Sequence, residues 1–283
     1  MTLLITGGSG YLGGELVRQA GPDTAHPRLE LLDPAAVRAG FEAVRPSAVI
    51  HTAYRQADPR VNTDGSAAVA EAAAEVGARL IHLSTDIVFD GRATTAYTED
   101  DEPNPLDDYG RSKLEAERGL AELGLDWAAL RPVLVYGPGV KGNMAALLSL
   151  AQSPWPLPLG GLTAKRSLLS LDNLAAAVDA VLKAEGSLRR PFIAADPEPV
   201  TIPEMVTALR RGLGRGPGLI PVPSFVLKGA ATLAGKGEAY QRLAGSLVAS
   251  PEALKNLGWQ PVSSTRDALA ELARQAGGPA SGA

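Results

Sequence analysis

The chain of 283 residues contains no cysteine and only three histidines. The absence of cysteine excludes disulfide bridges, thiolate nucleophiles and cysteine-ligated zinc. No two histidines have the H-x-x-x-H spacing of helical zinc sites, so we expect no metal site. Any catalysis must therefore rely on hydroxyl, phenol, carboxylate or ammonium groups.

Long runs of one kind are also missing. The net charge is −4, from 27 basic and 31 acidic side chains, and no lysine- or arginine-rich run suggests binding to nucleic acid. No apolar run approaches the ~20 residues that span a bilayer, and Thr2–Thr6 is too short for the apolar region of a signal peptide. We therefore expect a cytoplasmic protein with neither a nucleic-acid nor a membrane partner, in which local groups bind any phosphate.

Apolar runs typical of buried strands alternate with helical patterns in the first half of the chain. The strand-like runs are Leu3–Thr6, Ala48–Thr52 and Arg79–Ser84, and the helical segments are Tyr11–Ala20, Val61–Val76 and Asp108–Leu123. This alternation predicts βαβ units with right-handed crossovers. The expected fold is α/β, a doubly wound parallel sheet of the Rossmann type with a smaller C-terminal substrate-binding part.

The pattern of strands and helices is less regular in the second half, which suggests that the two halves have different functions. We expect a dinucleotide-binding core over residues 1–160 and a mainly substrate-binding part over residues 161–283. Within the latter, Arg166–Leu171 and Pro191–Ala194 have strand patterns and Asp172–Lys183 has a helical one. Residues 166–195 are therefore expected to return to the core.

A glycine-rich turn directly follows the first strand, with the pattern Gly7-x-x-Gly10-x-x-Gly13. In dinucleotide-binding folds the first glycine permits a sharp turn, the second lets the backbone approach a pyrophosphate, and the third lets the helix pack closely on the sheet. The free N–H groups of the following helix attract the negative charge. This segment predicts NAD or NADP binding.

The choice between the two cofactors is open. An acidic residue about 20 positions after the last glycine would hold the ribose 2′-hydroxyl of NAD, and Asp33 has that spacing. Asp33 also fits the N-cap of a helix that begins at Pro34. If Leu29–Leu32 is already the third strand, His26 or Arg28 would instead lie near the 2′-phosphate of NADP.

Two further motifs indicate proton transfer. Tyr109 and Lys113 stand four residues apart on a predicted helix, so they share a face, and a cation there would stabilise a phenolate. Ser84-Thr85-Asp86 follows the strand Arg79–Leu83, at the end of the sheet where ligands bind in open α/β folds. A hydroxyl there could hold a substrate carbonyl while Tyr109 protonates it.

Taken together, these motifs resemble the extended short-chain dehydrogenase/reductases, and most of all their dTDP-4-dehydrorhamnose reductase branch. The resemblance covers about residues 1–150. It rests on Thr6-Gly7-Gly8-Ser9-Gly10-Tyr11-Leu12-Gly13, Ser84-Thr85-Asp86-Ile87-Val88-Phe89-Asp90-Gly91, Tyr97-Thr98-Glu99-Asp100 and Pro103-Asn104-Pro105-Leu106-Asp107-Asp108-Tyr109-Gly110-Arg111-Ser112-Lys113-Leu114.

The resemblance implies the roles of individual residues. The catalytic residues would be Thr85, Tyr109 and Lys113. The cofactor would contact Gly7, Ser9, Gly10, Tyr11, Leu12, Gly13, Asp33, Ala53, Tyr54, Tyr109, Lys113 and Pro132. The substrate, a nucleotide sugar, would contact Thr85, Asp86, Phe89, Tyr109, Asn143 and Arg166.

The implied activity is reduction of a nucleotide-activated 4-keto-deoxysugar with NADP or NAD. Tyr136–Gly139 and Arg166–Leu174, however, look more like the nucleotide-sugar epimerases and dehydratases of the same superfamily. A 4-epimerase or dehydratase is therefore one alternative. A non-catalytic, cofactor-binding regulatory subunit is another, and a homodimer is one of the assembly states left open.

Overall fold

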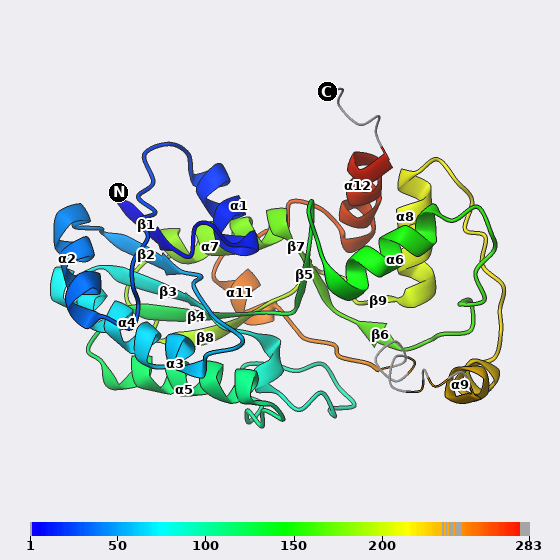
Figure 1. Cartoon of the computed structure of the whole chain (residues 1–283), viewed down its shortest axis with the longest axis horizontal. Coiled ribbons are helices and arrows are strands. Elements are labelled where there is room, and N and C mark those ends of the chain that lie inside the picture. Colours follow the sequence, from blue (N-terminus) through cyan, green and yellow to red (C-terminus); the bar gives the residue numbers. More distant parts are fainter. Residues whose placement is uncertain (1, 234, 236, 238–239, 241–244, 278–283) are drawn as a thin grey trace.

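The computed structural model describes residues 2–233, 235, 237, 240 and 245–277, and its centre is a five-stranded parallel sheet (Figure 1). The strand order is β1-β2-β3-β4-β8. The strands are short and most of their residues are buried and apolar, which is typical of a sheet covered on both faces. Their bounds are Leu3–Thr6 (β1), Ala48–His51 (β2), Arg79–Leu83 (β3), Trp127–Pro132 (β4) and Arg190–Ala194 (β8).

Helices pack on both faces of this sheet, as Figure 1 shows. Helices α1 (Tyr11–Ala20) and α7 (Leu171–Lys183) contact each other and cover one face. Helices α2 (Pro34–Val44), α4 (Asp64–Val76) and α5 (Asp108–Glu122) cover the other, over a second buried cluster. The predicted doubly wound fold is confirmed: β8 is a strand of the core sheet and α7 packs on it.

The segment between α1 and α2 differs from the expectation. Leu29–Leu32 forms no strand, and the only sheet pairing of this segment is an isolated parallel bridge between Ala25 and Leu4. Leu29 and Leu31 instead pack beneath α2 and α4, where a Cβ on Gly40 or Gly65 would touch them. Because α2 begins at Pro34, too few residues remain for a full second strand.

A third buried cluster lies around α6 (Gly142–Gln152), α8 (Ile202–Gly212) and α12 (Thr265–Gly277). The predicted strand Arg166–Leu171 is two separate strands: β6 (Lys165–Arg166) pairs with β9 (Val200–Thr201), and β7 (Leu168–Ser170) pairs with β5 (Leu134–Tyr136). The other helices are α3 (Pro59–Asn62), η1 (Asp86–Val88), α9 (Ser224–Leu233) and α11 (Glu252–Asn256). Although α6 precedes residue 160, it packs with the C-terminal helices.

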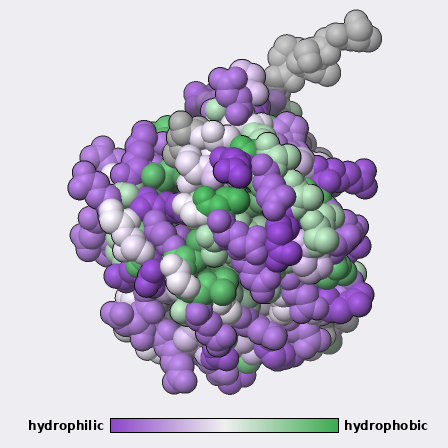
Figure 2. Space-filling model, turned by 90° about the vertical axis from the view of Figure 1, so that its left-hand side faces the viewer, coloured by the Kyte–Doolittle hydropathy of each residue, from purple (hydrophilic) through white to green (hydrophobic). Residues whose placement is uncertain are grey.

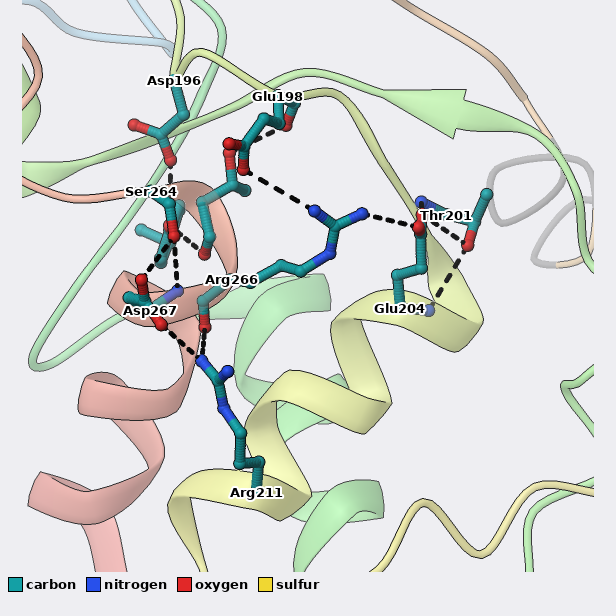
Figure 3. A network of polar contacts seen from close by, with 10 residues as sticks. Asp196, Glu198, Thr201, Glu204, Arg211, Ser264, Arg266 and Asp267 are labelled. Atoms are coloured by element: carbon teal, nitrogen blue, oxygen red, sulfur yellow. Dashed lines mark hydrogen bonds and ion pairs between the residues drawn. The ribbon is translucent and has the colours of Figure 1, made fainter.

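A network of ion pairs connects α8 to α12 (Figure 3). Arg266 contacts Glu204 at 2.7 Å and Glu198 at 3.8 Å, and Arg211 contacts Asp267 at 2.6 Å. These side chains are exposed, so each pair stabilises the fold by at most about 1 kcal/mol. They join the two helices beside the apolar cluster that α8 and α12 share.

The surface at the end of the molecule formed by the core sheet is mainly hydrophilic, with hydrophobic residues gathered in small areas (Figure 2). Among the described residues, no helix combines the length and the apolar character needed to cross a membrane.

Candidate active site

A cavity of about 1290 Å³ opens at the carboxyl ends of β1, β2, β3 and β4. This is the end of an open parallel sheet where ligands bind. Its lining joins the glycine turn to the ends of β2 and β3, to the start of α5 and to the residues after β4.

The glycine turn fits a pyrophosphate. Gly7 has a φ of 73°, in the left-handed region that favours glycine. A Cβ on Gly13 would lie 2.3 Å from the Gly7 carbonyl oxygen and 2.5 Å from Thr52 Oγ1, so only glycine lets α1 start this close to the sheet. No side chain caps α1 and no acidic residue lies in its first turn, which leaves its N–H groups free for an anion.

Thr85, Tyr109 and Lys113 all line this cavity, although they come from two separate elements. Lys113 is 1% exposed, and its Nζ donates a hydrogen bond to the Leu83 carbonyl at 2.7 Å. The Tyr54 ring lies beside both α5 residues, 5.7 Å from the Tyr109 ring and 5.8 Å from Lys113 Nζ. A hydroxyl, a phenol and an ammonium thus line the same cavity.

A glycine next to Tyr109 makes this grouping possible. A Cβ on Gly110 would lie 2.5 Å from the Ile87 carbonyl oxygen, so α5 can approach η1 this closely only without a side chain there. The N-cap Asp107, whose carboxylate accepts from Gly110 N at 2.7 Å, starts the helix at this point. The two features bring the start of α5 next to Thr85.

Burial shifts the pKa of Lys113, Tyr109 and Asp86 in the cavity. Desolvation lowers the pKa of Lys113 to about 8, although the Glu117 carboxylate opposes that change. Desolvation raises the pKa of Tyr109, with smaller contributions from Tyr54 and Asp86, so its phenol keeps its proton at neutral pH. Burial also raises the pKa of Asp86 to about 6.

Beneath the cavity lies a buried ion pair between Arg131 of β4 and Glu117 of α5, each 5% exposed. Arg131 Nη2 lies 2.6 Å from Glu117 Oε2, and its Nε lies 3.1 Å from Oε1. The Ser84 hydroxyl donates to the same carboxylate. This network fixes the residue that precedes Thr85.

Most of the expected cofactor residues line the cavity. They are Gly7, Ser9, Gly10, Tyr11, Leu12, Gly13, Ala53, Tyr54, Tyr109, Lys113 and Pro132, and Asp86 joins them from the substrate set. Asp33 lies outside the lining. Its carboxylate accepts from Ala35 N at 3.0 Å and from Ala36 N at 3.2 Å, so it caps α2, as the second interpretation of the sequence has it.

Three expected substrate residues also lie outside the lining. Phe89 is buried, stacks on Tyr97 with ring centroids 4.5 Å apart and lies under Arg131. Asn143 is exposed near the start of α6, and Arg166 Nη2 donates to the Gly245 carbonyl at 2.6 Å. The three side chains therefore do not line the cavity that holds Tyr109, and their contact with a substrate stays a prediction.

The structure adds cavity residues that the sequence motifs do not single out for a role there: Glu30, Arg55 and Gln56. Each stands in an irregular segment, where no periodicity indicates which side chains face a ligand. His26 and Arg28, noted above only as one alternative, line the cavity as well.

Two histidines lie in the core below the cavity. His51 and His82 are fully buried with ring centroids 5.3 Å apart, and burial lowers the pKa of His51 to about 3. Within the described part of the chain, no group of three or more histidine, aspartate or glutamate side chains is placed to hold a metal ion.

Comparison with known proteins supports the same family. A family model described as the RmlD substrate binding domain matches residues 1–159. The chain is 33% identical to a UDP-glucose 4-epimerase of Vibrio cholerae, over 79% of this chain and 70% of that protein. It is 34% identical to a dTDP-4-dehydrorhamnose reductase of Sinorhizobium fredii, over 54% of this chain and 57% of that protein.

A third relative, methionine adenosyltransferase 2 subunit beta of Xenopus tropicalis, is 36% identical over 52% of this chain and 51% of that protein. The chain therefore spans little more than half the length of the reductase from Sinorhizobium fredii and of this subunit from Xenopus tropicalis.

Solved structures share the fold over almost the whole chain. A dTDP-4-dehydrorhamnose reductase of Bacillus anthracis in complex with NADP superposes with a TM-score of 0.75 at 21% identity, covering 96% of this chain and 98% of that one. The Bordetella bronchiseptica enzyme WbmG in complex with NAD and UDP gives a TM-score of 0.74 at 21% identity, covering 97% and 92%. The chain belongs to the RmlD substrate binding domain family, within the extended short-chain dehydrogenase/reductases.

Proposed function

We propose that the protein is an NAD(P)-dependent reductase of a nucleotide-activated 4-keto-deoxysugar, as in dTDP-4-dehydrorhamnose reductases. The observation that carries the proposal is that Thr85, Tyr109 and Lys113 line one cavity together with the glycine turn. A phenol beside a buried ammonium is suited to proton transfer, and the turn is suited to a pyrophosphate. The family membership and the reductase relative support the same assignment.

In this proposal the glycine turn, Ala53, Tyr54, Lys113 and Pro132 hold the cofactor, since all of them line the cavity. When bound, the reduced nicotinamide supplies a hydride to a keto carbon. The Thr85 hydroxyl holds the keto oxygen, and Tyr109 donates its phenolic proton to that oxygen. Lys113 then stabilises the phenolate by its positive charge.

The cavity favours NADP over NAD. Ala25 pairs with Leu4 in parallel, so Arg28 follows the bridge at the carboxyl end of the sheet, beside the glycine turn. Arg28 is exposed, lines the cavity and has no ion pair among the described residues. With Asp33 engaged in capping α2, we propose that Arg28, assisted by His26, meets the adenosine 2′-phosphate.

Three of the residues expected to bind the substrate lie outside the cavity. A nucleotide sugar carries a diphosphate, and in a chain of net charge −4 a local cation must bind it. Arg166 stays the prediction for this cation and Asn143 a prediction for a neutral substrate contact, since both lie outside the cavity that holds Tyr109.

The direct test is to mix the protein with dTDP-4-dehydrorhamnose and either NADPH or NADH, and to follow the loss of reduced-nicotinamide absorbance. We expect turnover, faster with NADPH at low cofactor concentration. The Tyr109→Phe variant should bind NADPH normally and lose turnover by about 10²–10⁴-fold. Full activity of Tyr109→Phe would refute the mechanism, and no turnover with either cofactor would refute this substrate.

A nucleotide-sugar 4-epimerase is the second candidate, because the Vibrio cholerae relative aligns over 79% of this chain. An epimerase regenerates its own cofactor. Nicotinamide cofactor that copurifies with the protein, and interconversion of UDP-glucose and UDP-galactose without net oxidation, would favour this function over the reductase.

The relative named as a subunit of methionine adenosyltransferase supports a third candidate, a cofactor-binding regulatory subunit. The complete set of Thr85, Tyr109 and Lys113 favours an enzyme instead. Tight NADPH binding without turnover of any keto-sugar, together with a copurifying enzyme, would favour the regulatory function.

A further inference from the structure

Helix α5 contacts the end of β3 at two successive residues, through side chains one turn apart. Lys113 Nζ donates to the Leu83 carbonyl at 2.7 Å, and the Glu117 carboxylate accepts from the hydroxyl of Ser84, the next residue. Residues four apart on a helix share a face, so both contacts come from the same side of α5. Thr85 is the next residue along the chain.

The Glu117 carboxylate is itself held in place. Arg131 of β4 contacts both of its oxygens, and the side chains of Arg131 and Glu117 are each 5% exposed. The guanidinium also lies over the Phe89 ring, with Arg131 Cζ 5.2 Å from the ring centroid. A carboxylate with so many donors is held in one orientation.

We propose that Glu117 is a positioning residue of the candidate active site: clamped by Arg131, it fixes Ser84, and through it Thr85, and its carboxylate is the counter-charge to the Lys113 ammonium one helical turn away. The inference rests on the proposed function for its catalytic consequence. The contact of Glu117 with Ser84 and its effect on the charge of Lys113 do not depend on that function.

The electrostatic part follows from what surrounds Lys113. Desolvation lowers its pKa to about 8, and Glu117 is the group that raises it. The charged or titratable groups that face it are His51 of β2, His82 of β3, Tyr54 after β2, Tyr109 and Glu117 of α5, and Arg131 of β4 behind Glu117. The two histidines are neutral because burial lowers the pKa of each, so Glu117 is the anion available to balance the ammonium.

The test compares Glu117→Gln with Glu204→Gln. The first substitution keeps the shape and an acceptor oxygen but removes the charge at the site. The second makes the same chemical change in the exposed pair with Arg266, outside the cavity. Lysine ¹³Cε NMR titrations of the cofactor-free proteins report the pKa of Lys113, and steady-state kinetics report kcat and KM across pH.

We expect Lys113 to titrate below the wild-type value of about 8 in Glu117→Gln only. The kcat should fall about tenfold or more, and the alkaline limb of the pH profile should move to lower pH, with the KM for cofactor little changed. An unchanged pKa of Lys113 with unchanged kcat would overturn the proposal. A protein without any keto-sugar turnover would refute the proposed function, while the NMR titration still decides this inference.

Ser84→Ala provides a second measurement that does not disturb the buried ion pair. It removes only the hydroxyl that joins Glu117 to the strand end. We expect a lower kcat with an unchanged pKa of Lys113. If Glu117→Gln does not fold, a wild-type kcat in Ser84→Ala overturns the positional part of the proposal.

Discussion

The Lys113 ammonium donates its hydrogen bond to the backbone carbonyl of Leu83, the last residue of β3. The side chain is 1% exposed, so this bond forms in the protein interior, directly below the cavity. It links the helix that carries Tyr109 to the strand end that carries Thr85.

Turnover is expected to depend on pH through Lys113. Burial lowers the pKa of this ammonium to about 8, so it is charged below that pH and becomes neutral above it. The charged form stabilises the Tyr109 phenolate, and turnover should therefore fall as the pH rises through about 8. Initial rates at saturating NADPH and sugar across this range check the prediction, and a rate that keeps rising above that pH would contradict it.

Replacing Arg28 by methionine should weaken NADPH binding by about tenfold or more, with NADH binding unchanged, because only NADPH carries a 2′-phosphate. Fluorescence titration measures both affinities. Arg38→Met is the matched control, since Arg38 is an exposed arginine paired with Glu75 on the outer face of α2. Equal losses for NADPH and NADH would argue that Arg28 does not contact the 2′-phosphate.

Replacing Gly13 by alanine should lower the free energy of unfolding by about 1–3 kcal/mol and abolish tight cofactor binding. The added Cβ would lie 2.3 Å from the Gly7 carbonyl oxygen, and neither backbone segment can move without opening the turn. Gly119→Ala in α5 is the control, because no atom lies within 4 Å of its Cβ position. That control should gain about 0.5–1 kcal/mol from the removal of a helical glycine. Similar urea midpoints for the two variants would be incompatible with this explanation.

The buried Asp196 should make the protein less stable as the pH rises from about 4 to 6. Burial raises the pKa of its carboxyl to about 6, above the ordinary value, so the folded state binds its proton more tightly than the unfolded chain does. The stabilisation is therefore present at acidic pH and is lost as the pH rises through the folded-state pKa. Asp86, whose pKa burial also raises to about 6, acts in the same direction.

The Asp196→Asn variant isolates this contribution. Asp196 accepts hydrogen bonds from Tyr136, Asn173 and the Ser170 amide. An asparagine oxygen keeps the latter two, while its NH₂ donates to a Tyr136 hydroxyl that turns toward the Thr265 carbonyl, 3.2 Å away. We expect urea unfolding to show a smaller decrease in stability between about pH 4 and pH 6 than in the wild type. An identical pH dependence in both proteins would exclude Asp196 as its source.

Local patterns predicted much of the fold and part of the candidate site. The spacing of Gly7, Gly10 and Gly13 after an apolar strand places the turn at the cavity, because the backbone constraints that require glycine there are local. Tyr109 and Lys113 face the same cavity because an α-helix puts residues four apart on one side. These inferences need only the period of one element and the order of strands and helices.

Local patterns did not predict the structure of the segment between α1 and α2. Its apolar run Leu29–Leu32 has the composition of a strand, yet its leucines pack beneath helices that are distant in the sequence. Asp33 had two interpretations of equal local merit, and the start of α2 at Pro34 made it a cap. Arg166 and Asn143 likewise fit a family motif, but their place depends on how the C-terminal elements pack.

The sequence by itself therefore determined the parallel sheet, the glycine turn and the Tyr109/Lys113 pair, because periodicity and backbone geometry act over a few residues. Tertiary structure alone decided that Phe89, Asn143 and Arg166 lie outside the cavity and that Arg131 clamps Glu117 beneath it. Each of these depends on elements separated along the chain that meet only when the sheet and its helices pack, and no local pattern encodes such a meeting.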